Sequence, residues 1–201
     1  MNWCMEMVPI IFLMETCNNF HPLFLLLFRY DGEWKQGKKD GLGTLKYSSG
    51  AKYEGGWKEG LANGRGRFFY LNGDKYDGNW ENGKKNGLGT YFYKNKQKYE
   101  GNWKVDQKNG RGVFSYANGD TYQGDWVNGQ KHGQGIYVYS NGDHYEGDWQ
   151  FDKPHGTGFM SFANEDKYNG GWYQGKKSGT GKYLVILDKT LYLFFIVLKW
   201  R

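Results

Sequence analysis

The sequence predicts an all-β protein built as an elongated, single-layer antiparallel array of β-hairpins. The first observation behind this prediction is a 23-residue period that runs through most of the 201-residue chain without an insertion or deletion. A fixed period of this length is typical of an array of identical small units. The second is the composition: of 32 glycines, 30 fall at recurring positions, and the apolar material is 17 Tyr, 13 Phe and 9 Trp spread along the chain. This favours units that contact only their neighbours over one bulky core.

Residues 1–29 precede the repeats and form a separate hydrophobic leader. Glu15 and Pro22 interrupt its apolar stretches, so it lacks the run of about 18 apolar residues that would span a bilayer. Its first charged side chain is Glu6, whereas a secretory signal begins with positive charge. The two cysteines of the chain both lie here and support neither a disulfide framework nor a metal site. We expect an apolar plug on the first repeat or a start site mis-assigned in the gene model.

Residues 30–183 hold seven copies of the repeat. Counting its first tyrosine as offset 0, each copy has Gly at offsets 2, 11 and 13 and Trp at offset 4, and most also have Gly at offsets 7 and 20. Copies one to seven open at Tyr30, Tyr53, Tyr76, Tyr99, Tyr122, Tyr145 and Tyr168. Because side chains alternate along a strand, offsets 0, 2 and 4 share one face, and offsets 11, 13, 15 and 17 share a face of the next strand. Each copy is therefore predicted to be a β-hairpin with one aromatic face.

Two kinds of connection join these strands. The run Ala117-Asn118-Gly119 at offsets 18 to 20 favours a three-residue loop, because this loop pairs offset 17 with 21 and keeps all aromatics on one side. The other connection, Lys35 to Asp40 in copy one, is predicted to be a longer loop of six residues, in which Gly at offset 7 takes a positive φ angle. Glycines at offsets 2, 11 and 13 are expected to leave recesses for Tyr and Trp rings.

The opening tyrosines and the tryptophans of the middle copies are predicted to form a structural aromatic face. Each large ring buries on the order of 150 to 250 Å² at about 25 cal/mol per Å², which makes these rings the main favourable contribution to folding. A lone hairpin cannot cover its own apolar face, so stacking of copies is what stabilises the fold. The predicted face comprises Tyr53, Trp57, Tyr76, Trp80, Tyr99, Trp103, Tyr122, Trp126, Tyr145 and Trp149.

The run YEGDW, followed by a glycine-rich turn, then GxG and an aromatic residue at a 23-residue period, resembles the MORN repeat family. The resemblance covers residues 30–183. It implies a MORN-repeat meander, or solenoid, used for scaffolding, protein binding, dimerisation and attachment to membranes or to cytoskeletal and ciliary structures. Similar repeats occur in junctophilins, some plant phosphatidylinositol phosphate kinases and a histone lysine methyltransferase. Phospholipid binding is implied by the family name and varies between members.

Residues 184–201 form a hydrophobic tail in which the repeat decays. Val185 and Asp188 stand where an aromatic residue and a glycine are expected. The final run LYLFFIVLKWR is too short to span a bilayer. Three alternatives stay open: a capping strand, an interfacial anchor held by Lys199 to Arg201, or translated non-coding sequence that is an artefact of the gene model.

The basic residues suggest one candidate binding edge. The net charge of +6 and the pI of about 9.1 favour anionic partners. Offsets 5 to 10 carry a total charge of +7 over the seven copies, and on an anionic bilayer each nearby Lys adds about 1 kcal/mol. Nucleic acid is not expected, because the aromatic rings are needed for packing. The candidate anionic-lipid edge consists of Lys38, Lys39, Lys84, Lys85, Lys176 and Lys177.

Motifs for catalysis or for cofactor binding are not found in the sequence. No copy reads GxGxxG before a helix or GxxxxGKS. His132 and His155 are interpreted as loop residues, because no Cys or carboxylate constellation accompanies them. The acidic row at offset 1, such as Asp77 and Glu100, is interpreted as a solvated face paired with lysines at offset 22. We therefore expect no enzyme activity, catalytic residue, metal, cofactor or small-molecule substrate.

The leading hypothesis is a non-enzymatic scaffold or adaptor that binds another protein or a second copy of itself. We expect it in the cytoplasm, peripheral at a membrane, the cytoskeleton or a cilium. One alternative is a peripheral phosphoinositide-binding module that uses the basic edge. The other is the regulatory part of a protein resembling a phosphatidylinositol phosphate kinase or a lysine methyltransferase.

Overall fold

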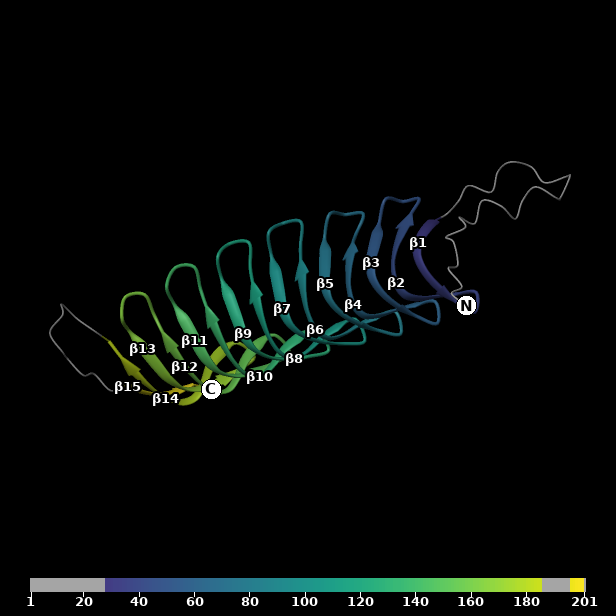
Figure 1. Ribbon diagram of the computed structural model, residues 1–201. Coiled ribbons are helices and arrows are strands. Elements are labelled where there is room, and N and C mark those ends of the chain that lie inside the picture. The colour runs from purple at the N-terminus through teal and green to yellow at the C-terminus, as the bar shows by residue number, and fades with distance from the viewer. Residues whose placement is uncertain (1–27, 186–195, 201) are drawn as a thin grey trace, which may run out of the picture.

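The structure is a single antiparallel sheet of fifteen strands, in which every strand pairs with its neighbours in the sequence (Figure 1). The computed structural model describes residues 28–185 and 196–200, so nearly all of the leader and part of the tail lie outside the described residues. The described residues contain no helix, and the predicted all-β hairpin array is confirmed. The strands are β1 (Phe28–Lys35), β2 (Lys38–Tyr47), β3 (Lys52–Lys58), β4 (Leu61–Phe69), β5 (Lys75–Glu81), β6 (Lys84–Phe92), β7 (Lys98–Lys104), β8 (Gln107–Ser115), β9 (Thr121–Val127), β10 (Gln130–Val138), β11 (His144–Gln150), β12 (Lys153–Ser161), β13 (Lys167–Tyr173), β14 (Lys176–Leu184) and β15 (Ile196–Trp200).

Within each copy, a two-residue turn joins the two strands. In copy one, Lys35 pairs with Lys38, and the turn residues Gln36 and Gly37 have φ angles of 50° and 74°. Positive φ at both central residues is the signature of a type I′ turn. The aspartates that replace this glycine in copies four and six adopt the same positive φ, as aspartate tolerates. The six-residue loop predicted for this connection is therefore wrong, because strand pairing continues up to the two turn residues.

Between copies, the predicted three-residue loop is confirmed. In the first such loop, the Tyr47 N–H donates to the Ala51 carbonyl, and the Gly50 N–H donates to the Tyr47 carbonyl, both at 2.9 Å. Gly50 has a φ of 95°, which glycine adopts without steric cost. Leu45 then pairs with Tyr53 of the next copy. This register keeps the aromatic side chains of successive copies on the same face.

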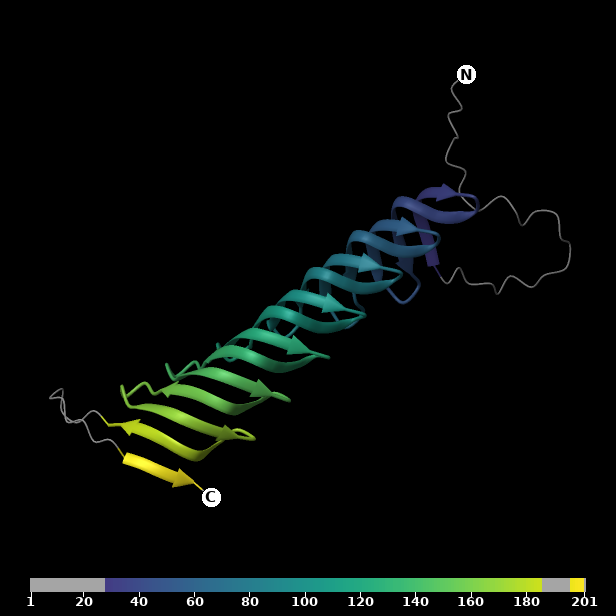
Figure 2. The ribbon, with the colours of Figure 1, turned by 90° about the horizontal axis from the view of Figure 1, so that it is seen from below.

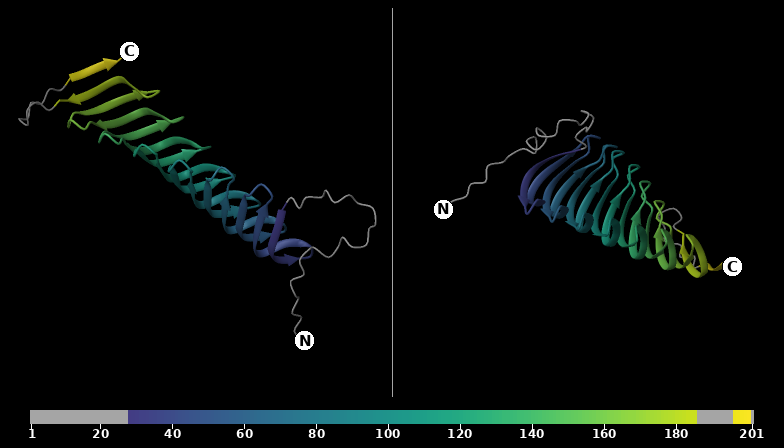
Figure 3. Two further views of the ribbon diagram at one scale, coloured as in Figure 1. Left: turned by 90° about the horizontal axis from the view of Figure 1, so that it is seen from above. Right: turned by 90° about the vertical axis from the view of Figure 1, so that its right-hand side faces the viewer.

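A β-bulge in each copy bends the strands. In copy five, the register shifts between His132 and Gly135, and Gly133 between them has a φ of 58°. Bulges of this kind bend the strand that carries them. The ring centroids of Tyr122 and Trp126 lie 5.2 Å apart, whereas residues four apart in a straight strand are separated by about 13 Å. The strands are curved (Figures 2 and 3), and the closeness of these rings shows that the aromatic side is the concave face of the array.

The tyrosine at offset 0 and the tryptophan at offset 4 form the floor of this concave face. In copy five, a Cβ atom added to Gly135 would lie 2.5 Å from Tyr122 Oη, so the ring needs a glycine beneath it. Tyr122 Oη donates to the Asp125 carbonyl at 3.0 Å, and Trp126 Nε1 donates to the Gly112 carbonyl of the preceding copy at 3.3 Å. The tyrosine bond recurs in all seven copies, and the indole bond joins each of the last six to the copy before it.

The glycines serve two purposes rather than the one expected from the sequence. Gly124 and Gly135, at offsets 2 and 13, pair across the hairpin and leave the predicted recess for the tyrosine ring. At offset 11, all seven glycines have a positive φ between 58° and 98°. Gly64 and Gly179 at this offset have no atom within 4 Å of an added Cβ. Offset 11 is therefore glycine because of the backbone conformation of the bulge.

The C-terminal end of the array is covered by one more strand. β15 pairs antiparallel with β14, and Gly179 lies opposite Trp200. This pairing agrees with the capping-strand alternative for the tail, whose role stays a prediction. The described part of the chain has no helix with the length and hydropathy needed to cross a bilayer.

Candidate functional site

The floor of the concave face is fully used in packing. Each floor tyrosine of copies one to six contacts the tryptophan of its own copy and that of the next copy edge to face, as Tyr99 does with Trp103 and Trp126 at centroid distances of 5.2 and 5.3 Å. The structure buries all ten residues predicted for the structural aromatic face: Tyr53, Trp57, Tyr76, Trp80, Tyr99, Trp103, Tyr122, Trp126, Tyr145 and Trp149. These rings belong to the core, and Trp80 is the most exposed of the ten at 8%.

A second set of rings, at offsets 15 and 17, runs along the same concave face. Two rings of one copy lie close together, as Tyr91 and Tyr93 do at 4.5 Å, and Tyr93 contacts Phe114 of the next copy at 5.8 Å. We call this set the ladder: Tyr47, Phe68, Tyr70, Tyr91, Tyr93, Phe114, Tyr116, Tyr137 and Tyr139. Its offset-17 rings are only partly buried. The ladder is therefore a continuous aromatic strip that solvent still reaches.

Five lysines at offset 9 extend over this face. In copy four, Lys108 Nζ lies 3.9 Å from the Trp126 ring centroid and 4.7 Å from that of Phe114, within the range of cation–π attraction. Burial lowers the pKa of Lys108 to about 8. Copies two and six carry Ala62 and Pro154 at the same offset. We call the five side chains the groove lysines: Lys39, Lys85, Lys108, Lys131 and Lys177.

Aspartates at offset 21 hold the rim of the concave face in place. Asp120 accepts hydrogen bonds from Tyr137 Oη at 2.7 Å and from the Ser140 N–H at 2.8 Å, both in the next copy. The bond from Tyr137 is the main cause that keeps the pKa of the Asp120 carboxyl below its usual range. Asp74 accepts the equivalent bond from Tyr91 Oη at 2.8 Å. Each of these bonds fixes a ladder ring and joins one copy to the next.

The structure does not place the six predicted edge lysines together. Lys38, Lys84 and Lys176 are exposed at the start of their strands, beside the two-residue turns. Lys84 already pairs with Asp106 at 2.9 Å. The other three, Lys39, Lys85 and Lys177, are groove lysines that lie partly buried over aromatic rings. The two halves of the set therefore face different sides of the sheet, because neighbouring residues of a strand point in opposite directions.

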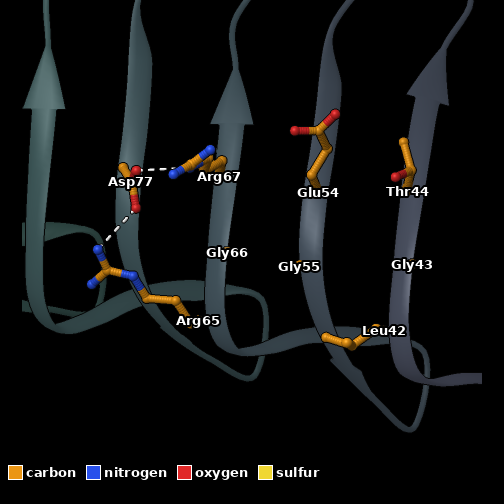
Figure 4. Close-up of a pocket in the computed structure, with 9 residues that line it drawn as sticks. All are labelled: Leu42, Gly43, Thr44, Glu54, Gly55, Arg65, Gly66, Arg67 and Asp77. Atoms are coloured by element: carbon orange, nitrogen blue, oxygen red, sulfur yellow. Dashed lines mark hydrogen bonds and ion pairs between the residues drawn. The ribbon is translucent and has the colours of Figure 1, made fainter.

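The outer, convex face carries the charged pairs expected from the acidic row. Lysines at offset 22 pair with the carboxylates at offset 1, in Lys52–Glu54 at 2.7 Å, Lys75–Asp77 at 3.9 Å and Lys98–Glu100 at 3.1 Å. An open recess on this face runs over a row of glycines and is bordered by Arg65, Arg67 and Asp77 (Figure 4). Both guanidinium groups contact Asp77, at 3.0 and 2.8 Å. Exposed pairs of this kind contribute little to stability and offer no activated nucleophile or base.

Residues 28–185 and 196–200 contain no group of three or more His, Cys, Asp or Glu side chains that could hold a metal ion. His132 and His155 contact Phe151 and Tyr173, which lie in or directly beside two-residue turns, at centroid distances of 5.8 and 5.3 Å. The two histidines thus belong to the apolar packing of the turns.

Sequence reasoning missed the groove lysines as a feature of the aromatic face. The predicted six-residue loop placed offset 9 outside the strands, so no sheet face was predicted for this side chain. With a two-residue turn, offset 9 pairs with offset 4, as Lys131 does with Trp126, and side chains of paired residues share a face. The recurrence of lysine at this offset in five of seven copies was the available signal.

A known family of repeats matches most of the chain. The family model described as the MORN repeat matches residues 30–52, 53–75, 76–98, 99–121, 122–144, 145–167 and 168–184. No curated protein matches the chain significantly.

Among solved structures, the chain is similar to the SAS-4 (dCPAP) TCP domain of Drosophila melanogaster in complex with a proline-rich motif of Ana2, with a TM-score of 0.47, 13% identity and coverage of 84% of this chain and 91% of that one. It is also similar to the wild-type TCP10 domain of Danio rerio CPAP, with a TM-score of 0.44, 9% identity and coverage of 79% and 73%. These values mark a distant likeness, from which no function follows.

Proposed function

The chain belongs to the MORN repeat family, and from this premise we propose that it is a non-enzymatic scaffold that binds a protein segment along its concave face. The ladder carries this proposal. Large exposed aromatic surfaces that run together mark interaction sites, and Tyr is among the residues that dominate binding energy at protein interfaces. The offset-17 rings, such as Tyr93 and Tyr116, are the part of the concave face that packing leaves open.

The proposed occupant is an elongated segment, either extended or helical, that lies along the array. The ladder crosses successive copies without a break from Tyr47 to Tyr139, and repeat arrays use such extended concave surfaces for binding. The rim aspartates and groove lysines add polar partners beside the rings. A second copy of this chain is a protein partner of the same kind and is covered by the same experiment.

Two finer expectations belong to the proposal as well. A location in the cytoplasm, peripheral at a membrane or at cytoskeletal or ciliary structures, remains a prediction. Binding of an anionic bilayer is the weaker alternative, because three of the six lysines on which it rests lie partly buried over rings. Sedimentation with phosphoinositide liposomes, compared with neutral liposomes at low and high salt, tests that alternative directly.

The experiment uses two adjacent residues that face opposite sides of the sheet. Tyr93 belongs to the ladder, whereas Phe92 is exposed on the outer face beside the Lys75 and Lys98 strands. A photoreactive benzoylphenylalanine replaces one or the other in the full chain, which is then irradiated in a lysate of its own cells. We expect a discrete crosslinked protein from position 93 and none from position 92. Crosslinks from position 92 alone, or equal crosslinks from both, would contradict the proposal.

A further inference from the structure

Each groove lysine ends in a cage of three or four aromatic side chains, and in copies three and five the four rings come from three consecutive copies. In copy five, Lys131 Nζ lies 4.6 Å from the Trp149 centroid, 4.8 Å from Tyr137, 5.5 Å from Tyr122 and 5.9 Å from Tyr116. Aromatic faces whose centroids lie within about 6 Å attract a lysine ammonium. The fold therefore builds an ammonium site once per copy and fills it from its own chain in copies one, three, four, five and seven.

Copy two has the same cage without the lysine. Its rings are Tyr47, Tyr53, Phe68 and Trp80, with centroid distances of 6.1 Å for Tyr47–Phe68, 6.2 Å for Phe68–Trp80 and 5.3 Å for Tyr53–Trp80. The corresponding distances in copy five are 5.6, 6.0 and 5.1 Å. The arrangement of rings is thus nearly unchanged where the cation is missing.

The copy-two cage stays accessible from its open side. Ala62 pairs with Trp57 in the register in which Lys131 pairs with Trp126, and it packs against the aromatic core without a cationic group. Trp80, which has no lysine over it, is 8% exposed, and the tryptophans beneath groove lysines are 2 to 7% exposed. Tyr47, at the edge of the same cage, is 38% exposed. The opening faces the concave side, where the proposed partner lies.

We propose that the copy-two cage binds the ammonium group of a lysine side chain from the partner protein. This inference rests on the proposed function, since it assigns one residue type to the partner that lies on the concave face. The occupant follows from the chain itself, because the five other cages hold a lysine ammonium. Copies three, four and five already place such charges in consecutive cages, which are about 10 Å apart at two strands per copy. A cation between Lys39 and Lys85 therefore repeats a charge spacing that the fold accommodates.

Copy six also lacks the lysine, but its cage is poorer. Met160 replaces the offset-15 ring, and the bulkier Pro154 stands where copy two has Ala62. Loss of one aromatic face reduces the attraction for a cation. The copy-two cage therefore attracts a partner lysine more strongly than the copy-six cage does.

The test uses the full chain and a pair of matched small probes. Nα-acetyl-lysine-N-methylamide carries the ammonium group, and Nα-acetyl-norleucine-N-methylamide has the same length without it. Indole N–H signals of chains labelled at tryptophan are followed by NMR during titration, with the Trp80 signal assigned from Trp80→Phe. We expect a saturable shift of the Trp80 signal with the lysine probe and no such shift with the norleucine probe.

Two variants close and open a cage. Ala62→Lys restores the residue that five copies carry and should weaken the Trp80 response by roughly tenfold or more by filling the cage. Lys108→Ala opens the copy-four cage and should create a new response at Trp126. Far-UV circular dichroism checks that each variant folds, and if one does not, the other decides.

The inference is overturned by an absent Trp80 shift, by equal shifts with both probes, or by a shift that persists in folded Ala62→Lys. Any of these results leaves the crosslinking outcome at position 93 unaffected, because the probes report on the cage alone. Conversely, the lysine probe could shift the Trp80 signal while position 93 gives no crosslinks. That result would contradict the proposed scaffold function and support the ammonium site.

Discussion

The aromatic residues of the concave face fall into two groups, which differ in their contacts and in their burial. A floor tyrosine such as Tyr99 bonds to its own strand and contacts two tryptophans, and it has no exposed surface. A ladder tyrosine such as Tyr93 contacts Tyr91 and Phe114 and remains partly exposed to solvent. The first kind secures the fold by burial of apolar area, and the second leaves aromatic surface for a partner.

Trp126→Ala tests the role of the floor. Trp126 is 2% exposed and bonds to the preceding copy, so its removal should cost roughly 3 kcal/mol or more through the cavity that it leaves. Trp34→Ala is the matched control, because Trp34 occupies the same offset in the first copy and is 46% exposed. We expect the control to cost less than half as much in urea unfolding. An unchanged unfolding curve for Trp126→Ala would contradict the packing account.

Lys108 predicts a dependence of stability on pH. Burial holds its pKa at about 8 in the folded chain, against an ordinary 10.5. Below pH 8 the amine is charged in both states, and the attraction of the rings offsets only part of the hydration that burial removes. Above pH 8 the folded chain binds fewer protons than the unfolded chain. The stability of the wild type relative to Lys108→Met should therefore rise from pH 7 to pH 9.5, by on the order of 1 kcal/mol. Urea unfolding of both chains measures it, and a constant or falling difference would exclude the buried amine.

At the scale of secondary structure, the hairpins and the three-residue loops between copies could be predicted from the sequence. The two-residue turns within each copy could not. Asn118-Gly119 indicated a turn, and the requirement that Tyr122 share a face with the other aromatic residues was enough to predict the three-residue loop. The two-residue turn was missed, because its first residue varies from Gln36 to Val105 to Phe151, and only the backbone reveals the positive φ that they share. That error hid the groove lysines, and hence the part of the candidate site that alternation would have placed on the aromatic face.

Two glycines in neighbouring copies separate packing from backbone conformation. Gly112 lies under Tyr99, and a Cβ there would be 2.4 Å from Tyr99 Oη, so Gly112→Ala should cost about 1 to 3 kcal/mol by overpacking. Gly129 has a φ of 86° and nothing within 4 Å of an added Cβ. Gly129→Asp introduces the residue found there in copies four and six and should cost less than 1 kcal/mol, since aspartate tolerates this conformation. Equal costs in thermal unfolding would show that the two offsets are not distinguished in this way.

At the scale of the whole molecule, the array is one-dimensional. Every strand pairs only with its neighbours in the sequence, and the floor bonds reach one copy back. In such arrays, stability is close to a sum of repeat and interface contributions. The elongated shape and the single concave face (Figure 3) both follow from this repetition.

Removal of one whole period should therefore be tolerated. Deletion of residues 99–121 joins copy three to copy five in register, and we expect a folded chain that is less stable and shorter by about 10 Å, the width of two strands. Deletion of residues 99–109 removes half a copy and breaks the alternation that faces Tyr and Trp to one side. Small-angle scattering and circular dichroism distinguish the two. A half-copy deletion that folds as well as the whole-copy deletion would contradict the modular account.

The most direct test of the central claim is oxidative footprinting of the full chain with and without the protein captured from position 93. The ladder tyrosines Tyr93, Tyr116 and Tyr139 should be oxidised in the free chain and protected in the complex, while Phe92 and Val138 on the outer face remain equally reactive in both. Protection of the outer-face residues with no change at the ladder would place the partner on the convex side and contradict the assignment of the concave aromatic face as the binding surface.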